Sequence, residues 1–339
     1  MDEIYYNDSS LYDVKYYHIN IEASADTIFI NGFTEIGAVA IRKTLSSFFI
    51  QIHDSLKIDS VLIENYKLNF LHKNNWLKVY LPPDKNINVG NFFKTKIFYK
   101  GNVTSSNYMN FSNITAYNDY NIFYNLSEPF SSLDFYACKQ YLTDKADSAI
   151  ITVTTPTGQI AVSNGLLCEK KYNPNNNKVT WIWKTHYPIA YYLISITISN
   201  YKEYTYKFFD YQVKDSVLYQ NFIYNDESYF AENKDQIDDV VKVISYFEQI
   251  LNYPYPFYKE KYGQVNVPIS GGMENQTITT LSDFSFALVT HELAHSWFGN
   301  LVTCSNWQDI WINEGFATYL NYLAVEHFYP ENKEYWLET

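Results

Sequence analysis

The pentapeptide His291-Glu292-Leu293-Ala294-His295 constrains the fold more than any other stretch of this 339-residue chain. In an α-helix, residues four apart lie on nearly the same face, about 6 Å apart along the axis. Two imidazoles at that spacing can converge on one zinc ion, which takes histidine nitrogens at roughly 2.0–2.1 Å. Glu292 lies one position round the helix, where its carboxylate can accept a proton from water rather than bind the metal. The spacing therefore predicts a helix with two zinc ligands and a general base.

A third ligand is available further along the chain. Glu314, in the segment Trp-Ile-Asn-Glu-Gly, follows His295 by nineteen positions. A metzincin would instead need a glycine at position 298 and a histidine at 301, where this chain has Phe298 and Leu301. The alternative is a structural helix with partly buried histidines, but the rest of this helix is apolar and would leave them without partners. We therefore expect His291, His295 and Glu314 to bind one zinc ion.

Two adjacent glycines precede this helix, in Gly271-Gly272-Met273-Glu274-Asn275. Glycine has no Cβ, so backbone at these positions can approach a ligand closely. The carboxylate of Glu274, just beyond them, can bind a cation. Alone, such a pentapeptide would be a turn with an exposed glutamate. Its place ahead of the histidine helix favours a role in binding.

Residues 270–319 resemble the gluzincin zinc aminopeptidases, which include alanyl and leucyl aminopeptidases and the leukotriene hydrolase. The motifs that carry the resemblance are GGMEN at 271–275, HELAH at 291–295 and Glu314 in WINEG. The resemblance implies one Zn²⁺ per chain, Glu292 as the catalytic residue, and peptides with a free N-terminus as substrates. It also implies that Glu274 holds the substrate's α-amine, while the substrate backbone contacts Gly271, Gly272 and Met273.

A further segment, Leu126-Ser127-Glu128-Pro129, resembles the family's Glu-Pro stretch. It leads into Phe135-Tyr136-Ala137-Cys138, where the family has an aromatic-Pro-Cys strand and this chain has Ala137 in place of the proline. The resemblance implies that Glu128 is a second holder of the substrate amine. The alternative is an exposed glutamate before a turn.

Charge and hydropathy limit the possible partners. The net charge of −12 disfavours nucleic acid or an anionic membrane, since both require a basic surface. A negative field instead favours cationic substrates such as peptides with a free amino terminus. The apolar-leaning run 187–199 is too short to span a bilayer, so we expect no transmembrane segment. We expect a cytoplasmic protein if Met1 is the true start, and otherwise an exported one whose signal segment lies outside this sequence.

The chain is predicted to have an α+β fold with two domains. Residues 1–204 contain alternating apolar and polar residues separated by turn signals, which is typical of half-buried strands. Strands are predicted at 17–23, 27–30, 47–52, 60–63, 68–71, 76–81, 92–99, 149–154, 179–183 and 193–198. In the second domain, 205–339, we expect helices at 227–251, 284–300 and 312–327 and a strand at 264–267. The resemblance implies that residues 1–204 form a saddle-like N-terminal β domain and that residues 205–339 form part of a thermolysin-like catalytic domain.

In that family the catalytic domain continues well beyond the third ligand and supplies an oxyanion-stabilising tyrosine. We therefore expect this sequence to be an N-terminal fragment of a longer enzyme. The predicted function is that of a zinc-dependent aminopeptidase, using metal-activated water with a glutamate general base. A zinc endopeptidase and a catalytically inactive peptide-binding fragment remain the alternatives. The endopeptidase alternative predicts cleavage of N-acetylated peptides.

Overall fold

The computed structural model describes residues 10–103, 111–116 and 120–332. The chain divides into two compact units: Met1–Ile114 with Asn121–Ser199, and Thr115–Tyr120 with Asn200–Thr339. The predicted boundary at residue 204 falls inside strand β15 (Tyr201–Asp210), which belongs to the second unit. The first unit is built mostly of strands and the second of strands and helices, which confirms the α+β class.

A ten-stranded sheet forms most of the first unit, with the strand order β12-β13-β10-β1-β2-β7-β4-β5-β6-β3. Its strands are β1 (Tyr12–Ser24), β2 (Thr27–Ala40), β3 (Ser47–Gln51), β4 (Lys57–Ile63), β5 (Tyr66–Lys73), β6 (Trp76–Tyr80), β7 (Phe92–Asn102), β10 (Ser148–Pro156), β12 (Leu166–Asn173) and β13 (Lys178–Thr185). The alternation in β1 orients Tyr17, Ile19 and Ile21 into the core, as the sequence pattern predicts. Strand β1 pairs antiparallel with β2 and parallel with β10.

A four-stranded sheet has the order β11-β14-β9-β8. It consists of β8 (Phe111–Ala116), β9 (Tyr120–Asn125), β11 (Ile160–Ser163) and β14 (Ile196–Ser199). Short 3-10 helices occur at η1 (Pro83–Lys85), η3 (Ser132–Asp134) and η4 (Tyr191–Leu193).

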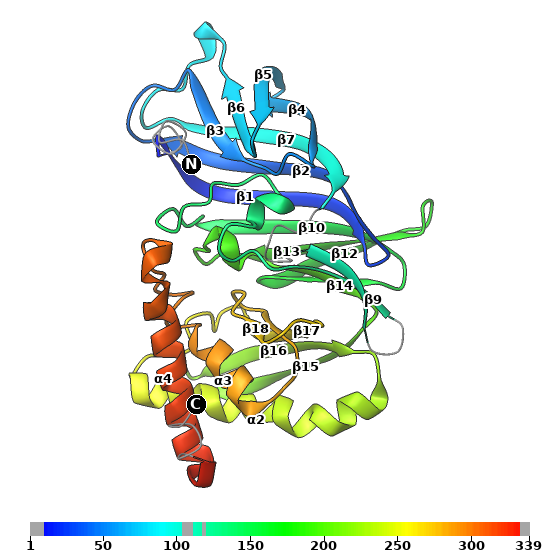
Figure 1. The fold of residues 1–339 in the computed structure, drawn as a ribbon, viewed down its shortest axis with the longest axis vertical. Coiled ribbons are helices and arrows are strands. Elements are labelled where there is room, and N and C mark those ends of the chain that lie inside the picture. The colour runs from blue at the N-terminus through cyan, green and yellow to red at the C-terminus, as the bar shows by residue number, and fades with distance from the viewer. Residues whose placement is uncertain (1–9, 104–110, 117–119, 333–339) are drawn as a thin grey trace. The chain divides into compact units, whose positions relative to one another are not determined.

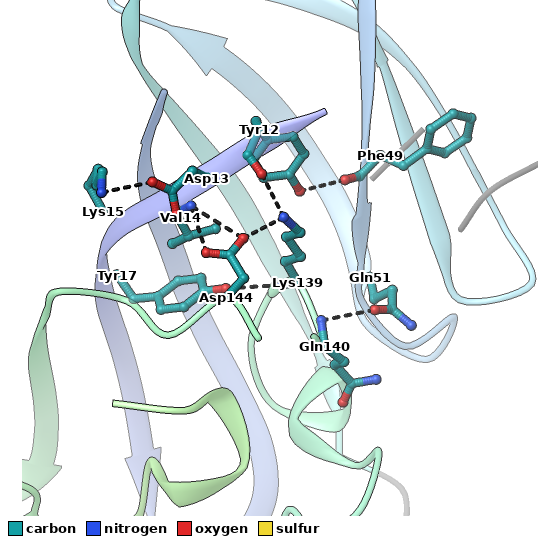
Figure 2. Close-up of polar contacts among 10 residues, drawn as sticks. All are labelled: Tyr12, Asp13, Val14, Lys15, Tyr17, Phe49, Gln51, Lys139, Gln140 and Asp144. Carbon is teal, nitrogen blue, oxygen red and sulfur yellow. Dashed lines mark hydrogen bonds and ion pairs between the residues drawn. The ribbon is translucent and has the colours of Figure 1, made fainter. Parts of the chain in front are cut away.

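A buried ion pair attaches the segment around Lys139 to β1 (Figure 2). The Lys139 ammonium pairs with the Asp144 carboxylate and donates to the Tyr12 carbonyl oxygen at 2.6 Å. Asp144 accepts a hydrogen bond from the Val14 backbone N–H at 3.1 Å, and the Lys139 N–H donates to the Tyr17 hydroxyl at 3.0 Å. These contacts connect parts of the first unit that are far apart in the sequence.

The second unit contains a five-stranded sheet with the order β15-β16-β17-β19-β18. Its other strands are β16 (Asp215–Tyr224), β17 (Lys261–Asn266), β18 (Gly272–Met273) and β19 (Thr279–Leu281). The helices are α2 (Glu227–Leu251), α3 (Phe286–Ala294) and α4 (Ile310–Phe328), with short 3-10 turns at η5 (Trp307–Asp309) and η6 (Pro330–Asn332). Helices α2 and α3 pack on the sheet, and α4 packs on α3 (Figure 1).

Helix α2 matches its predicted bounds because both ends carry strong signals. The Asp226 side chain caps the helix by accepting from the Tyr229 N–H at 2.8 Å. The buried face repeats at three- and four-residue spacing, and Asn252, in the left-handed region, ends the helix. Within the described ranges, no helix combines the length and apolar character that a membrane span requires.

Candidate metal centre

Helix α3 presents two histidines one turn apart. It is shorter than the predicted 284–300, which is wrong at both ends: the helix begins at Phe286, and the chain turns back after His295. The Asn300 N–H donates to the His295 carbonyl at 2.9 Å, and Gly299 has φ +140°. That conformation favours glycine, so the turn is encoded at a single position. The Nε2 atoms of His291 and His295 lie 3.2 Å apart.

Glu314 lies in the first turns of α4, and its carboxylate is close to the Nε2 atoms of both histidines. Its Oε2 lies 3.3 Å from Nε2 of His291 and 3.5 Å from Nε2 of His295. Tetrahedral zinc with ligands at 2.0–2.1 Å would hold its ligand atoms roughly 3.3–3.4 Å apart. The three predicted ligands therefore form a triangle of the size that a zinc ion requires.

The charges around this triangle favour a cation. Burial opposes the charged form of His295, but the carboxylates of Glu274, Glu314 and Glu292 outweigh it and raise the pKa of His295 to about 10. Burial would raise the pKa of Glu314, but hydrogen bonds with His291 and His295 hold it well below its usual range. Excess negative charge at a buried point is the environment in which a divalent cation is stabilised.

The backbone after α3 orients His295. Its Nδ1 lies 3.0 Å from the Phe298 carbonyl oxygen, which can only accept a hydrogen bond. Nδ1 therefore carries a proton, which leaves Nε2, beside Glu314 and His291, as the nitrogen that would bind a metal ion. A Cβ on Gly299 would lie 3.2 Å from this Nδ1, so a larger residue would crowd the ring.

Glu292 is buried beside the edge strand β18 and the preceding Gly271, which together are called the glycine edge of the sheet. A Cβ at Gly272 would lie 2.6 Å from Glu292 Oε1, so the absence of a side chain at this position leaves room for the carboxylate. Burial raises the pKa of Glu292 to about 8; His295 opposes this shift, and Glu274 and Glu314 add to it. A carboxyl group that titrates near neutral pH is suited to transferring protons.

Glu274 follows the two-residue strand β18, which pairs antiparallel with β19. Glu274 is 4% exposed, unlike the exposed glutamate of an ordinary turn. Carboxylate oxygens of Glu274 and Glu292 and a ring nitrogen of His295 lie within 4.8 Å of one another. Glu274 Oε1 has no hydrogen-bond partner among the described residues. A buried carboxylate oxygen without a donor is unfavourable, so this atom is available for a cationic ligand.

Glu128 belongs to the first unit, in the loop after β9. Its peptide bond to Pro129 is cis, and the Tyr191 hydroxyl donates to the Pro129 carbonyl at 2.7 Å. Its role as a second amine holder stays a prediction.

Sequence reasoning missed three buried residues near these motifs: Asn300, Thr290 and Asn321. Asn300 Nδ2 donates to the Glu274 carbonyl at 2.8 Å and so connects the glycine edge with the turn after α3. The Thr290 hydroxyl donates a hydrogen bond to Asn321 Oδ1 at 2.7 Å. Thr290 and Asn321 lie within helices and Asn300 lies in a turn, and no local sequence pattern distinguishes these common polar residues from surface residues.

Comparison with known proteins shows matches to one family. Residues 236–339 match the peptidase family M1 domain. Aminopeptidase M1-A of Oryza sativa subsp. japonica is 30% identical over 203 residues, which are 53% of this chain and 21% of the rice protein. Endoplasmic reticulum aminopeptidase 1 of Mus musculus is 36% identical over 113 residues, covering 29% of this chain and 12% of the mouse protein. The family match includes all three predicted zinc ligands, His291, His295 and Glu314.

These matches confirm the predicted resemblance to the gluzincin aminopeptidases. The fold agrees over nearly the whole chain. An M1 zinc metallopeptidase from Deinococcus radiodurans superimposes with a TM-score of 0.76 at 20% identity, covering 93% of this chain and 71% of the other. By sequence, the match to the rice M1 aminopeptidase spans about a fifth of that relative's length.

Proposed function

We propose that this protein is a zinc aminopeptidase that removes the N-terminal residue from peptides. The observation that carries the proposal is the ligand triangle, with edges of 3.2, 3.3 and 3.5 Å, beside two further buried carboxylates. The matched relatives support it, since they are named as aminopeptidases and zinc metallopeptidases.

His291, His295 and Glu314 would hold the zinc ion. When bound, zinc polarises the scissile carbonyl and lowers the pKa of water from 15.7 toward about 7. His295 is fixed for this task by its hydrogen bond with Phe298.

Glu292 is the proposed general base. It would take a proton from the attacking water and deliver it to the nitrogen of the leaving peptide. The carboxylate is buried, which excludes bulk water, and its raised pKa of about 8 allows it both to accept and to release a proton near neutral pH.

Glu274 is the proposed holder of the substrate's α-ammonium. Its buried Oε1, which has no donor among the described residues, would accept a charge-assisted hydrogen bond from that group. An internal peptide segment lacks this charge and would leave the carboxylate unpaired. The family resemblance adds Glu128 as a second proposed holder and Gly271, Gly272 and Met273 as contacts for the substrate backbone.

The test is to measure zinc content and hydrolysis of free and N-acetylated aminoacyl-coumarin substrates. Both measurements are made on this chain and on any natural extension beyond Thr339. We expect about one zinc per chain and cleavage of free-amine substrates alone. Equal cleavage of acetylated substrates would identify an endopeptidase. Bound zinc without activity in either form would favour a peptide-binding protein, and absence of zinc from both would overturn the proposal.

A further inference from the structure

A buried polar pair joins the two helices that carry the predicted zinc ligands. The Thr290 hydroxyl of α3 donates to Asn321 Oδ1 of α4 at 2.7 Å. The Asn321 Nδ2 donates in return to the Ala287 carbonyl at 2.8 Å. Thr290 is 0% and Asn321 3% exposed, so water does not compete for either bond.

These two residues lie close to the ligands along each helix. Asn321 follows Glu314 by seven positions, which is two turns, so both side chains project from the same face of α4. Thr290 directly precedes His291, and Ala287 lies one turn before it. The two hydrogen bonds therefore connect the face of α4 that carries Glu314 to the turn of α3 that carries His291.

Binding of the metal requires α3 and α4 to be aligned more precisely than apolar packing alone achieves. A slip of one residue moves a helical side chain by about 1.5 Å along the axis and 100° around it. Zinc ligand distances are defined within about 0.2 Å. Small buried residues such as Ala317 and Ala324 of α4 pack without directional bonds and do not select one register as sharply as a hydrogen-bonded pair does.

We propose that Thr290 and Asn321 are positioning residues for the metal, because their hydrogen bonds fix Glu314 against His291 and His295. This inference rests on the zinc site of the proposed function, but it concerns residues that touch neither metal nor substrate.

The main test measures zinc affinity, by competition with a chelator, in Asn321→Leu. Leucine removes the link without leaving an unpaired donor, because the Thr290 hydroxyl also lies 2.8 Å from the Phe286 carbonyl. We expect the zinc Kd to rise about tenfold to a hundredfold, the usual effect of losing a group that orients a metal ligand. Thr290→Val should also weaken zinc binding, whereas Thr290→Ser keeps the hydroxyl and should bind as the wild type does.

A second readout separates positioning from general stability. In protein loaded with Co²⁺, the visible absorption bands report the geometry of the ligands. We expect them to change in Asn321→Leu and Thr290→Val and to stay unchanged in Thr290→Ser. The matched control is Asn266→Leu, since Asn266 is also buried in the second unit and its Nδ2 donates to the Leu281 carbonyl at 3.3 Å. This control should lower the Tm without changing the zinc Kd or the cobalt spectrum.

The outcomes distinguish this inference from the proposed function. If wild type binds zinc and Asn321→Leu binds it equally well with the same cobalt spectrum, the positioning role is overturned and the zinc site stands. If Asn321→Leu does not fold, the comparison of Thr290→Val with Thr290→Ser decides: equal zinc affinities would overturn the role. If the wild-type protein binds no zinc, the proposed function and this inference both fail.

Discussion

Glu292 and Glu274 are the same kind of residue in nearly the same place, with carboxylate oxygens and a His295 nitrogen all within 4.8 Å of one another. Their proposed roles differ because their positions on the backbone differ. Glu292 projects from α3 toward Gly272, whereas Glu274 directly follows β18. The two roles are separable by substitution.

Glu292→Gln keeps the shape of the side chain and removes its ability to accept a proton. We expect kcat to fall about 100-fold to 10,000-fold, the usual contribution of a general base, with zinc content unchanged. Steady-state kinetics and metal analysis of the same preparation test this. A variant that has lost its zinc would instead show that Glu292 supports the structure of the site.

Glu274→Ala removes the proposed partner of the substrate ammonium. A hydrogen bond to a charged group contributes about 1.5–3 kcal/mol, so KM for free-amine peptides should rise about tenfold to a hundredfold. Binding of N-acetylated peptides should change little, because they have no ammonium group. Inhibition constants for a free and an acetylated dipeptide provide the comparison, and an equal loss for both would rule out the amine role.

The residue scale is also where the sequence was most informative. His291, Glu292 and His295 could be predicted because helical geometry alone fixes their spacing. Glu314 was predicted from its position nineteen residues after His295, and the family resemblance supports that prediction. The Asn300–Glu274 and Thr290–Asn321 bonds could not be predicted, because they depend on how separate elements pack in three dimensions.

At the scale of elements, the end of α2 carries a pH-sensitive contact. Glu248 is buried near the end of this helix and accepts a hydrogen bond from the Tyr255 N–H at 2.6 Å. Burial raises the pKa of Glu248 to about 8; the Tyr255 bond opposes the shift, and the Asp210 carboxylate adds to it. The helix end is therefore most stable when this carboxyl group is protonated.

The sign of the effect follows from the raised pKa. The folded state keeps the Glu248 proton up to about pH 8, whereas the unfolded chain releases it above about 4.5. The contribution of Glu248 to the free energy of unfolding is fully present below pH 4.5 and is lost progressively as the pH rises to about 8. Glu248→Gln mimics the protonated form, so we expect it to be more stable than wild type at pH 8 and to have a flatter stability profile.

Urea unfolding of wild type and Glu248→Gln between pH 5 and 9 measures this difference. The matched control is Glu227→Gln in the first turn of the same helix, where the side chain is exposed and the pH profile should keep the wild-type shape. Parallel profiles for wild type and Glu248→Gln would show that Glu248 is ionised in the folded protein.

Predicted elements succeeded where a local pattern was present and failed where it was absent. Helix α2 was predicted at its observed bounds because a cap and a regular apolar face mark it. Helix α3 was predicted too long, since apolar residues continue through Trp297 and Phe298 although the helix ends at Ala294. Strand β12 was missed because its residues are mostly exposed on both faces and show no alternation. Strands β15 and β16 were missed because the predicted domain boundary was placed among them.

At the scale of the whole molecule, contacts distant in sequence hold the first unit together. The Lys139 ammonium lies beside Asp144 and the Tyr12 carbonyl, and Asp144 in turn binds the Val14 N–H, 130 positions earlier in the chain (Figure 2). Both charged side chains are buried, so each depends on the other for its stability.

Lys139→Met should destabilise the first unit by about 3–5 kcal/mol, because it leaves the Asp144 carboxylate buried without a cation. Adding Asp144→Leu should recover much of this loss, since an apolar pair of similar volume replaces a buried ion pair at little cost. Denaturant unfolding of the two variants and wild type tests both statements. A double variant no more stable than Lys139→Met would mean that the remaining contacts of Asp144, and not its pairing with Lys139, carry the effect.

The parallel pairing of β1 with β10 has a consequence for how the protein is made. Tyr16 pairs with Ser148, so the first strand of the sheet has one neighbour that is encoded 132 codons later. At about 5–20 residues per second, translation needs roughly 7–26 s to produce that neighbour. During this time the backbone N–H and C=O groups of β1 that pair with β10 in the folded protein have no strand to bind. The nascent chain is therefore exposed to aggregation during synthesis, and chaperones that bind extended apolar segments would protect it at that stage.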